Sequence, residues 1–598
     1  MLAWKTSLLR QATVASVITF FCVQVAPVAA QDATLAVAPA GLNQRVEVED
    51  VHLRLSSQVM IYRDEWGTPH VHGATDEAAI FGMGYVQSED YFWQVEDNCI
   101  RALGRYSELA GEKLLRADTL NRLFEVPRRS KEDYERLSDK QQKLLAAFTH
   151  GINYFLATHP DVKPRLIHRF EPHYVLAMDR YLLLDFVYGK AHAGRPNPRS
   201  FEAAVQEATG SNQWAVGPSR TKAGSTMLLI NPHQPWYGSG QFYEAHLISD
   251  EGTNFSGGCF YGNPIPTLGF NKYLGWAYTV NEPDVADVFR VKFSGKPKDG
   301  ALEYKFGDET RSAETWDDVI LVKKGKSLVE KKFTFYKTHH GPIVRFENDT
   351  TGLAVRIAAL FDLGRVDQAH EMIHATNFEQ WYDAMRHCGI PMFNVAYADR
   401  DGNIFYAYNG AIPVRDSRFD WREPVNGNDP ATEWKGIYAF DDLPQVLNPP
   451  SGYVQNCNTS PFLTTDEGNP NRGDFPAYMF EDRDEDKRRA KMSRRLLRSA
   501  MGLTFDDFRR LSLDTTLYWP LQELPRFRRD FESLKKENPP LAEKVRPFLE
   551  HLLDWDCKVI ESSTQATLCE AWYIELYGEG YPAETIRGQY ESSRMSRL

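Results

Sequence analysis

Residues 210–236 read GSNQWAVGPSRTKAGSTMLLINPHQPW. The runs SNQWAVG and STMLLIN have strand composition and flank a polar PSRTKAG turn, which predicts the start of a β-rich region. The preceding segment, AHAGRPNPRSFEAAVQEATG at 191–210, has two prolines and few large apolar residues, and it indicates an exposed linker. Ser211 therefore stands where a linker meets the first strand.

Both sides of this boundary carry clear periodicities. Upstream, VMIYRDEWGTPHVHG at 59–73 predicts two short strands around a turn, and residues 78–109 and 140–157 have helical spacing of apolar residues. Downstream, strand signals continue to Tyr408, and helical periodicity returns from Arg488. The pattern predicts an α+β domain in which helices and sheets form layers.

The composition excludes several classes of protein. The 598 residues are 42% hydrophobic and 25% charged, with a net charge of −12, and no basic run offers a path for phosphates, so a nucleic-acid partner is not expected. Aromatic residues make up 13% of the chain, which favours a bulky interior and an apolar ligand cleft.

The first thirty residues are typical of a secretory signal peptide. Lys5 and Arg10 precede an apolar stretch at 12–26, and small residues at 28–30 provide a cleavage site. We expect a periplasmic or secreted protein with no membrane span after removal of residues 1–30. The six later cysteines show no CxxC spacing, so a zinc ribbon is not indicated, and their number allows one or two disulfides in an oxidising compartment.

Of two common hydrolase motifs, the sequence contains one. His370-Glu371-Met372-Ile373-His374 matches HExxH, the pattern of zinc proteases, but Thr376 or Asn377 predicts a helix start after the pair rather than before it. The serine-hydrolase elbow GxSxG is missing from the chain. A zinc protease using residues 370–374 is thus a less favoured alternative.

The segment 210–236 resembles the start of the catalytic β chain in the penicillin amidase family of N-terminal-nucleophile hydrolases, which includes the acyl-homoserine lactone acylases. Other blocks resemble the family in the same order over about residues 59–497: IYRDEWGTPHVHG, FGMGYVQSEDYFWQ and GRYSELAG upstream, then GNPIPTLGFNKYLGWAYTVNEPDVADVF, THHGPIV, YADRDGNIFYAYNGAIPVR and NPPSGYVQNCNTSP. An ordered set of this kind is far more specific than any single motif.

The resemblance implies a four-layer αββα N-terminal-nucleophile hydrolase fold with flanking helices. It also implies that the precursor cuts itself before Ser211, so that residues 31–190 form a largely helical α chain, 191–210 a spacer, and 211–598 the catalytic β chain. The two chains would associate as a heterodimer. The expected activity is hydrolysis of the acyl amide bond of a small N-acylated substrate of the penicillin or acyl-homoserine lactone type.

Five residues of this sequence match catalytic positions of the family. Ser211 would be the nucleophile, with its own amine as base, since an α-amine titrates near neutral pH. Asn458 and the backbone N–H of Val280 would hold the oxyanion, His233 would lie near the amine, and Arg489 would support the site.

No cofactor is expected to be required for catalysis. Asp284 and Asp287 resemble two carboxylates that bind a structural calcium ion in the penicillin amidases. The resemblance also implies a β chain that continues beyond residue 598. The apparently short C terminus motivates an alternative function, that of a catalytically impaired acyl-binding relative.

Overall fold

The computed structural model describes residues 46–192, 210–236, 238–296, 302–480 and 486–577. The signal peptide predicted at 1–30 and the polar tail from residue 579 lie outside these ranges, as does most of the predicted 191–210 linker. Residues 191 and 192 of that linker belong to the end of a helix, and Gly210 begins a strand.

The N-terminal part contains the two strands and the two long helices that the periodicity predicts. The elements are α1 (Asp50–Ser56), β1 (Val59–Arg63), β2 (Pro69–Gly73), α2 (Asp76–Ala102), α3 (Ser107–Ala110), α4 (Leu115–Leu123), α5 (Val126–Tyr134), α6 (Asp139–Thr158) and α7 (His173–His192). Helix α2 begins after Thr75, whose side chain accepts a hydrogen bond from the Ala78 N–H, and α6 begins with a capping box between Ser138 and Gln141.

A nine-stranded sheet forms the centre of the molecule, in the order β1-β2-β5-β6-β7-β8-β16-β17-β19. Its remaining strands are β5 (Phe242–Ser249), β6 (Asn254–Phe260), β7 (Leu268–Asn271), β8 (Leu274–Thr279), β16 (Asn394–Asp399), β17 (Ile404–Tyr408) and β19 (Gln445–Leu447). Strand β2 pairs in parallel with β5, so segments on both sides of the 191–210 linker share one sheet.

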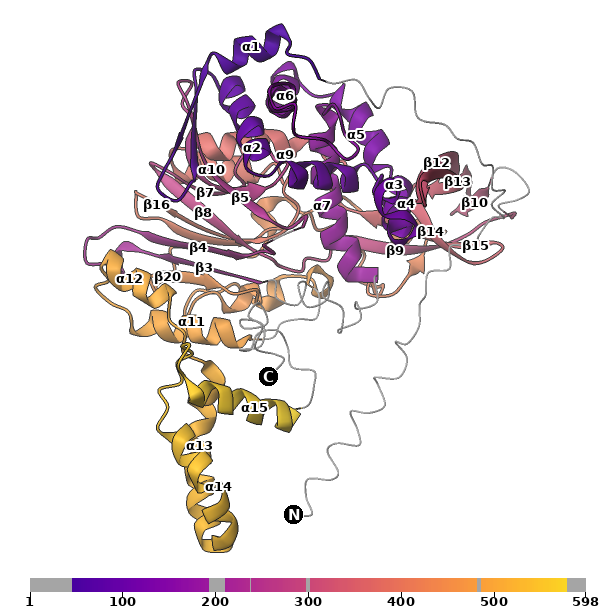
Figure 1. The fold of residues 1–598 in the computed structure, drawn as a ribbon. Coiled ribbons are helices and arrows are strands. Elements are labelled where there is room, and N and C mark those ends of the chain that lie inside the picture. The colour runs from indigo at the N-terminus through magenta and orange to yellow at the C-terminus, as the bar shows by residue number, and fades with distance from the viewer. Residues whose placement is uncertain (1–45, 193–209, 237, 297–301, 481–485, 578–598) are drawn as a thin grey trace.

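A second sheet, of three strands, carries the serine. It consists of β20 (Tyr453–Asn456), β3 (Gly210–Val216) and β4 (Met227–His233), with β3 in the middle. In Figure 1 the N-terminal helices lie above the large sheet, the small sheet lies below it, and α11 (Arg488–Ser499) and α12 (Phe505–Ser512) lie below the small sheet. Strands β3 and β4 contact β8 of the large sheet, so the two sheets face one another.

A third sheet, at the right of Figure 1, has the order β12-β13-β14-β15-β9-β18. Its strands are β9 (Ala286–Lys292), β12 (Glu314–Lys324), β13 (Ser327–Thr338), β14 (Gly341–Asn348), β15 (Thr351–Ile357) and β18 (Val425–Asn426), and a hairpin of β10 (Glu303–Phe306) and β11 (Glu309–Ser312) lies beside it. It has its own apolar core, which includes Phe289, Val291, Tyr304 and Trp421. Strand periodicity alone does not separate this sheet from the central one.

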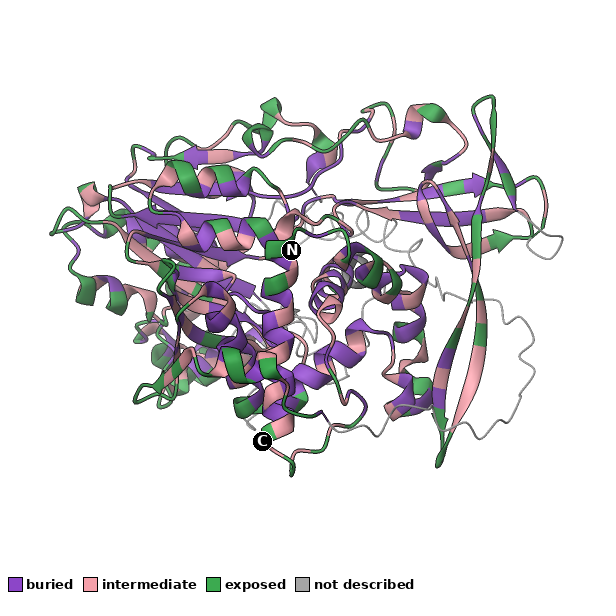
Figure 2. Ribbon diagram, turned by 90° about the horizontal axis from the view of Figure 1, so that it is seen from above, coloured by how far each residue is buried: buried purple, intermediate pink, exposed green. Residues whose placement is uncertain are grey.

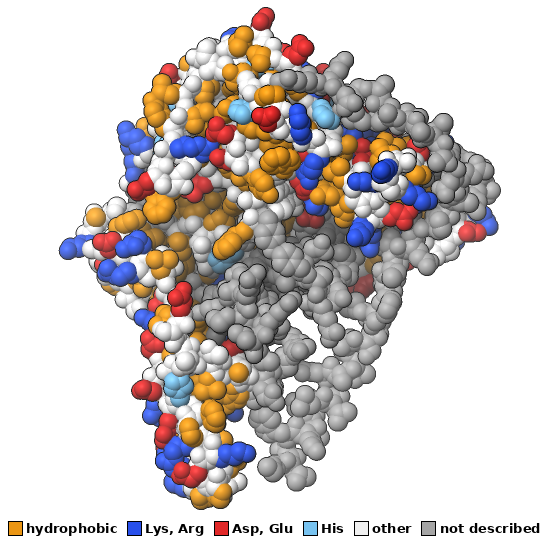
Figure 3. Space-filling view, viewed as in Figure 1, with side chains coloured by type: hydrophobic (Ala, Val, Ile, Leu, Met, Phe, Trp, Pro, Cys, Tyr) orange, Lys and Arg blue, Asp and Glu red, His pale blue; other side chains and the backbone are white. Residues whose placement is uncertain are grey.

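The helical periodicity predicted from Arg488 onward is confirmed by α11, α12, α13 (Tyr518–Glu537), α14 (Pro539–Leu553) and α15 (Thr564–Tyr577). The last three pack around a separate apolar cluster and project away from the body in Figure 1. Burial is concentrated in the strands of the sheets and the helix faces packed on them, while loop tips are exposed (Figure 2). Acidic and basic side chains are interspersed on the face drawn in Figure 3.

Two expectations concern the cysteines and the membrane. The cysteines at 99, 259, 388, 457, 557 and 569 are all free thiols in this structure. Within the described ranges, no helix is both long and apolar enough to cross a bilayer.

Candidate active site

Ser211 lies at the start of the central strand of the small sheet. In the β3–β4 register, Gly210 pairs with His233 and Ser211 with Pro232. The serine side chain is buried, with 2% of its surface exposed. Pairing with β4 therefore holds the Gly210–Ser211 peptide in an extended conformation inside the protein, and β20 pairs with β3 farther along, over residues 213–216.

The serine hydroxyl lies against the peptide bond that precedes it. Ser211 Oγ donates a hydrogen bond to the Gly210 carbonyl oxygen, and the backbone N–H of His233 approaches Oγ at 3.4 Å. A Cβ at position 210 would come within 3.0 Å of Arg489 Nη2 and 3.3 Å of Asn458 Oδ1. Gly210 is not in the left-handed region, so the close approach of these two side chains, rather than its backbone conformation, favours glycine at this position.

Asn458 reaches the serine from the loop that follows β20. Its amide oxygen accepts hydrogen bonds from the Ser211 N–H at 2.7 Å and from Arg489 Nη2 at 3.0 Å. Its Nδ2 donates to the Val280 carbonyl oxygen at 2.7 Å. The structure thus brings Asn458 and Val280 together beside Ser211, as the sequence predicts, although Val280 contributes a carbonyl group to this contact rather than an N–H.

Arg489 stands in the first turn of α11 and links three groups of the site. Its Nη1 donates to the Ser211 carbonyl oxygen at 2.9 Å and to Asn212 Oδ1 at 2.7 Å, in addition to the Nη2 bond to Asn458. The neighbouring Arg488 points elsewhere and donates to the Tyr573 hydroxyl at 3.2 Å. Of the two adjacent arginines, it is therefore Arg489 that contacts the site.

His233 contacts the serine only through its backbone in this structure. The imidazole Nε2 lies 3.0 Å from Asn231 Oδ1. Burial, together with the positive charge of Arg489, lowers the pKa of His233 to about 4, so the ring is neutral near pH 7. A neutral imidazole at this place can orient polar neighbours without adding charge to the site.

A buried amide network that sequence reasoning missed supports the Asn458 loop. Asn456 is fully buried, and its Oδ1 accepts hydrogen bonds from the Asn458 N–H at 2.8 Å, from Thr279 Oγ1 at 2.8 Å and from Asn394 Nδ2 at 3.1 Å. The network joins the loop to β8 and β16. Asn456, the first asparagine of QNCNTSP, was a visible signal, but its partners lie 62 and 177 residues away in the chain.

The two aspartates expected to bind calcium have another cationic partner. Arg415 Nε donates to Asp287 Oδ2 at 2.7 Å, and Arg415 Nη2 donates to Asp284 Oδ1 at 3.0 Å. The arginine side chain is fully buried, and its single positive charge is shared between the two acidic groups. Because a guanidinium already stands between these groups, the residues present do not fit a calcium site, which needs six to eight oxygens. Metal analysis of the purified protein tests the expectation of calcium at Asp284 and Asp287.

The HExxH residues lie within a helix, and the expectation that they precede one is wrong. Helix α9 (Gly364–His374) contains both histidines, and Asn377 caps the following helix, α10 (Phe378–Met385), as expected. Helix α9 has few apolar residues, so the sequence shows no clear helical periodicity there. His370 Nε2 lies 3.0 Å from Asp76 Oδ2, whereas Glu371 binds His387 at 2.8 Å. Glu371, which would be the general base of a zinc protease, is thus bound to His387, a histidine outside the motif.

Comparison with known proteins finds a family model and several relatives that match this chain. The penicillin amidase family model matches residues 58–593. The chain is 26% identical to the penicillin acylase 2 proenzyme of Pseudomonas sp. over 87% of this chain and 71% of that protein. It is 25% identical to the acyl-homoserine lactone acylase PvdQ of Pseudomonas fluorescens, over 67% of this chain and 59% of that protein.

Two further similarities cover less of this chain. Penicillin G acylase of Escherichia coli is 30% identical over 42% of this chain and 29% of its own length. A solved structure, the thermostable penicillin G acylase from Alcaligenes faecalis, superposes with a TM-score of 0.49 at 23% identity, over 61% of this chain and 64% of that chain. The chain therefore spans well under the full length of these relatives.

Proposed function

This chain belongs to the penicillin amidase family, hydrolases of carbon–nitrogen bonds other than peptide bonds, and from that premise we propose that it is a self-processing acylase with Ser211 as its nucleophile. The substrate class is a small N-acylated molecule of the penicillin or acyl-homoserine lactone type. The observation that carries the proposal is the contact of Ser211 Oγ with the Gly210 carbonyl group. Asn458 and Arg489 hold Ser211 in place through hydrogen bonds to its backbone N–H and carbonyl oxygen.

Self-cleavage follows from this contact. Ser211 Oγ attacks the Gly210 carbonyl carbon, the C–N bond breaks, and the released nitrogen takes a proton to become the Ser211 amine. Water then hydrolyses the resulting ester, leaving a carboxylate on Gly210 and a free Ser211 hydroxyl. The buried position of the peptide, in a strand between two others, holds the hydroxyl and carbonyl in register and limits their motion.

The same groups then act on substrate. The Ser211 amine accepts the hydroxyl proton as Oγ attacks the acyl carbonyl carbon, and the proton passes to the leaving amine of the substrate. Water hydrolyses the acyl-serine ester and restores the hydroxyl. Asn458 Oδ1, which accepts from the Ser211 nitrogen in the uncut chain, is placed to orient the amine, and the amide donor of Asn458 and the Val280 N–H are the proposed oxyanion partners.

The two proposed chains would remain associated after the cut. Strands β1 and β2, from the 31–190 α chain, continue the nine-stranded sheet through the β2–β5 pairing with the 211–598 β chain. Helix α2 also packs on β5. This shared sheet and the layers on either side of it support a heterodimer with the four-layer αββα arrangement. The residues 1–30 support a periplasmic or secreted location.

The direct test is Ser211→Ala. We expect a single chain without the cut before residue 211 and no amide hydrolysis, because both reactions use the same hydroxyl. Intact-mass measurement reads the first effect, and a panel of phenylacetyl, glutaryl and acyl-homoserine lactone amides reads the second. Ser239→Ala is the control, and it should process and turn over normally. A Ser211→Ala protein with a normal cut would refute the mechanism.

A further inference from the structure

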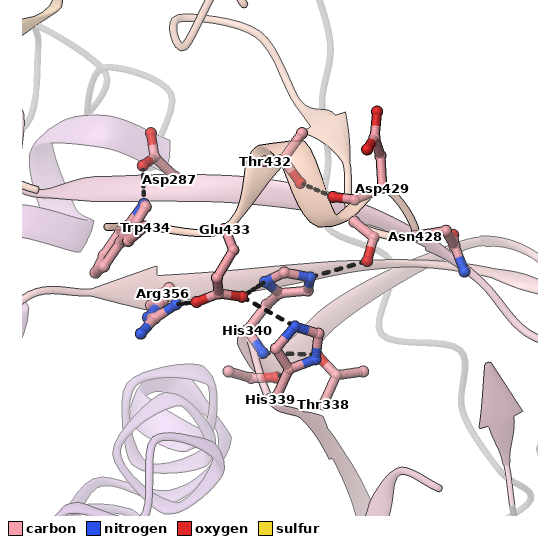
Figure 4. A network of polar contacts seen from close by, with 12 residues as sticks. Asp287, Thr338, His339, His340, Arg356, Asn428, Asp429, Thr432, Glu433 and Trp434 are labelled. Atoms are coloured by element: carbon pink, nitrogen blue, oxygen red, sulfur yellow. Dashed lines mark hydrogen bonds and ion pairs between the residues drawn. The ribbon is translucent and has the colours of Figure 1, made fainter. Parts of the chain in front are cut away.

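Two adjacent histidines and a glutamate converge at the edge of the third sheet. His339 and His340 form the turn between β13 and β14, and Glu433 follows the short helix η4 (Pro430–Thr432). His339 Nε2 lies 3.1 Å from Glu433 Oε2, and His340 Nδ1 lies 3.9 Å from the same oxygen. Figure 4 shows both rings turned toward the carboxylate. Three candidate ligand atoms, two imidazole nitrogens and one carboxylate oxygen, thus lie within 4.8 Å of one another.

Hydrogen bonding does not account for this arrangement. His339 Nε2, His340 Nδ1 and Glu433 Oε2 are all buried atoms without a hydrogen bond of acceptable geometry. The 3.1 Å approach of His339 to the carboxylate is close, but the ring N–H does not point along it. Buried polar groups in native proteins nearly always have partners, so three orphaned atoms at one point require an explanation.

His340 Nδ1 has a lone pair that accepts no hydrogen bond in this structure. His340 Nε2 donates to the Gly427 carbonyl oxygen at 2.8 Å, which assigns the proton to Nε2. The His340 side chain is fully enclosed, and its Nδ1 is buried without a hydrogen-bond partner. The ring stacks on Phe289 with centroids 4.0 Å apart, which fixes its direction. A histidine ligand held by a carbonyl through its other nitrogen is the usual arrangement at metal sites.

The other two groups are oriented in the same way. His339 Nδ1 lies 2.9 Å from the Tyr304 hydroxyl, which leaves Nε2 for the cluster. Arg356 binds the far oxygen of Glu433, Oε1, which leaves Oε2 for the cluster. The cluster therefore presents a carboxylate oxygen and two imidazole nitrogens.

We propose that His339, His340 and Glu433 form a zinc site that ties the β13–β14 turn to the segment after η4. Two imidazoles and one carboxylate are a common zinc ligand set, and zinc bonds of about 2.0–2.2 Å put tetrahedral ligands roughly 3.3 Å apart. The measured 3.1 and 3.9 Å separations bracket that value. The Glu433 and His339 side chains are 34% and 23% exposed, whereas the three ligand atoms themselves are buried.

Two other three-residue clusters among the described residues provide a contrast. In Asp76, His370 and His374, the ligand atoms are already hydrogen-bonded: His370 and Asp76 pair at 3.0 Å, and His374 Nε2 lies 2.9 Å from Thr253 Oγ1. The Glu49, His52 and His150 cluster is likewise bonded internally, with His150 Nδ1 3.2 Å from His52 Nε2. Internal hydrogen bonds explain those clusters without a metal, and they do not explain the one at Glu433.

The test is zinc binding by the full-length protein after removal of metal by dialysis against a chelator. We expect one tightly bound zinc per chain by elemental analysis, and at least a tenfold weaker affinity by titration in His339→Gln and in Glu433→Gln. His370→Gln is the matched control, since it alters the α9 cluster and should retain zinc binding. Cobalt(II) substitution supplies a second readout that is independent of stability, with the absorption bands of a tetrahedral site expected in the parent protein and lost in His339→Gln.

Three results would overturn the proposal. They are absence of stoichiometric zinc in the folded parent protein, unchanged zinc affinity in both cluster variants, and loss of zinc in His370→Gln with retention in His339→Gln. The last result would place the metal at α9 instead. None of these readouts depends on amidase activity, so they remain separate from any failure of the Ser211 mechanism.

Discussion

Replacing Asn458 offers a test that separates the chemistry of its amide from its backbone conformation. The residue has a φ of 60°, in the left-handed region, and its side chain makes three hydrogen bonds, to the Ser211 N–H, to Arg489 and to the Val280 carbonyl. Asn458→Ala removes the amide and also puts alanine at a left-handed φ that asparagine tolerates better. Asn458→Gly removes the same amide, but glycine adopts that φ freely.

We expect both variants to lose the same activity and to differ in stability. Loss of one oxyanion donor lowers kcat by about 10²–10³, equivalent to about 3–4 kcal/mol. The left-handed backbone should make the alanine variant about 1–2 kcal/mol less stable than the glycine variant. Both should also be less stable than the parent by about 1–3 kcal/mol for each buried partner left unpaired.

The assay measures turnover per processed chain, with the processed fraction determined by intact mass and stability by urea unfolding. Normalising to processed chain matters because the same amide contacts the Ser211 nitrogen before the cut. A glycine variant whose kcat per processed chain is within threefold of the parent would remove Asn458 from the oxyanion site. Equal stability of the two variants would show that the strained φ is not retained in solution.

Three further perturbations follow from charges and contacts in the structure. Burial holds the pKa of His233 at about 4, below the usual value of about 6.5, so the unfolded chain binds more protons than the folded chain between these pH values. The free energy of unfolding should therefore rise as the pH increases from 4 to 6.5. His233→Gln should flatten this rise, measured as the urea midpoint. His374→Ala removes contacts with Asp76 and Thr253 and should cost about 1–3 kcal/mol while self-cleavage continues, whereas a folded, cut and inactive protein would favour a catalytic metal at α9. Arg415→Met leaves two acidic partners uncompensated and should destabilise the protein by about 3–5 kcal/mol, and added calcium should raise the Tm of this variant more than that of the parent; an equal response would argue against a latent cation site.

Local patterns predicted the local elements well. The capped, amphipathic helices α2 and α6 and the strands β1 and β2 depend on residues close together in the chain, and they lie where the spacing indicates. Helix α9 was missed because its eleven residues include few apolar positions. The division of the strands into three sheets was also beyond periodicity, since a strand's pattern shows which face is buried but not which neighbour it pairs with.

The sequence by itself determined the family, the position of the serine after Gly210, and the set of residues that would gather around it, because ordered motifs record these features directly. Tertiary structure alone decided which of two adjacent arginines reaches Ser211, because adjacent residues of helix α11, Arg488 and Arg489, project in different directions. It also placed Arg415 between two aspartates about 130 residues earlier in the chain, and brought Glu433 to a histidine turn about 90 residues away. Contacts over such separations depend on how the sheets pack, and no spacing in the chain encodes them.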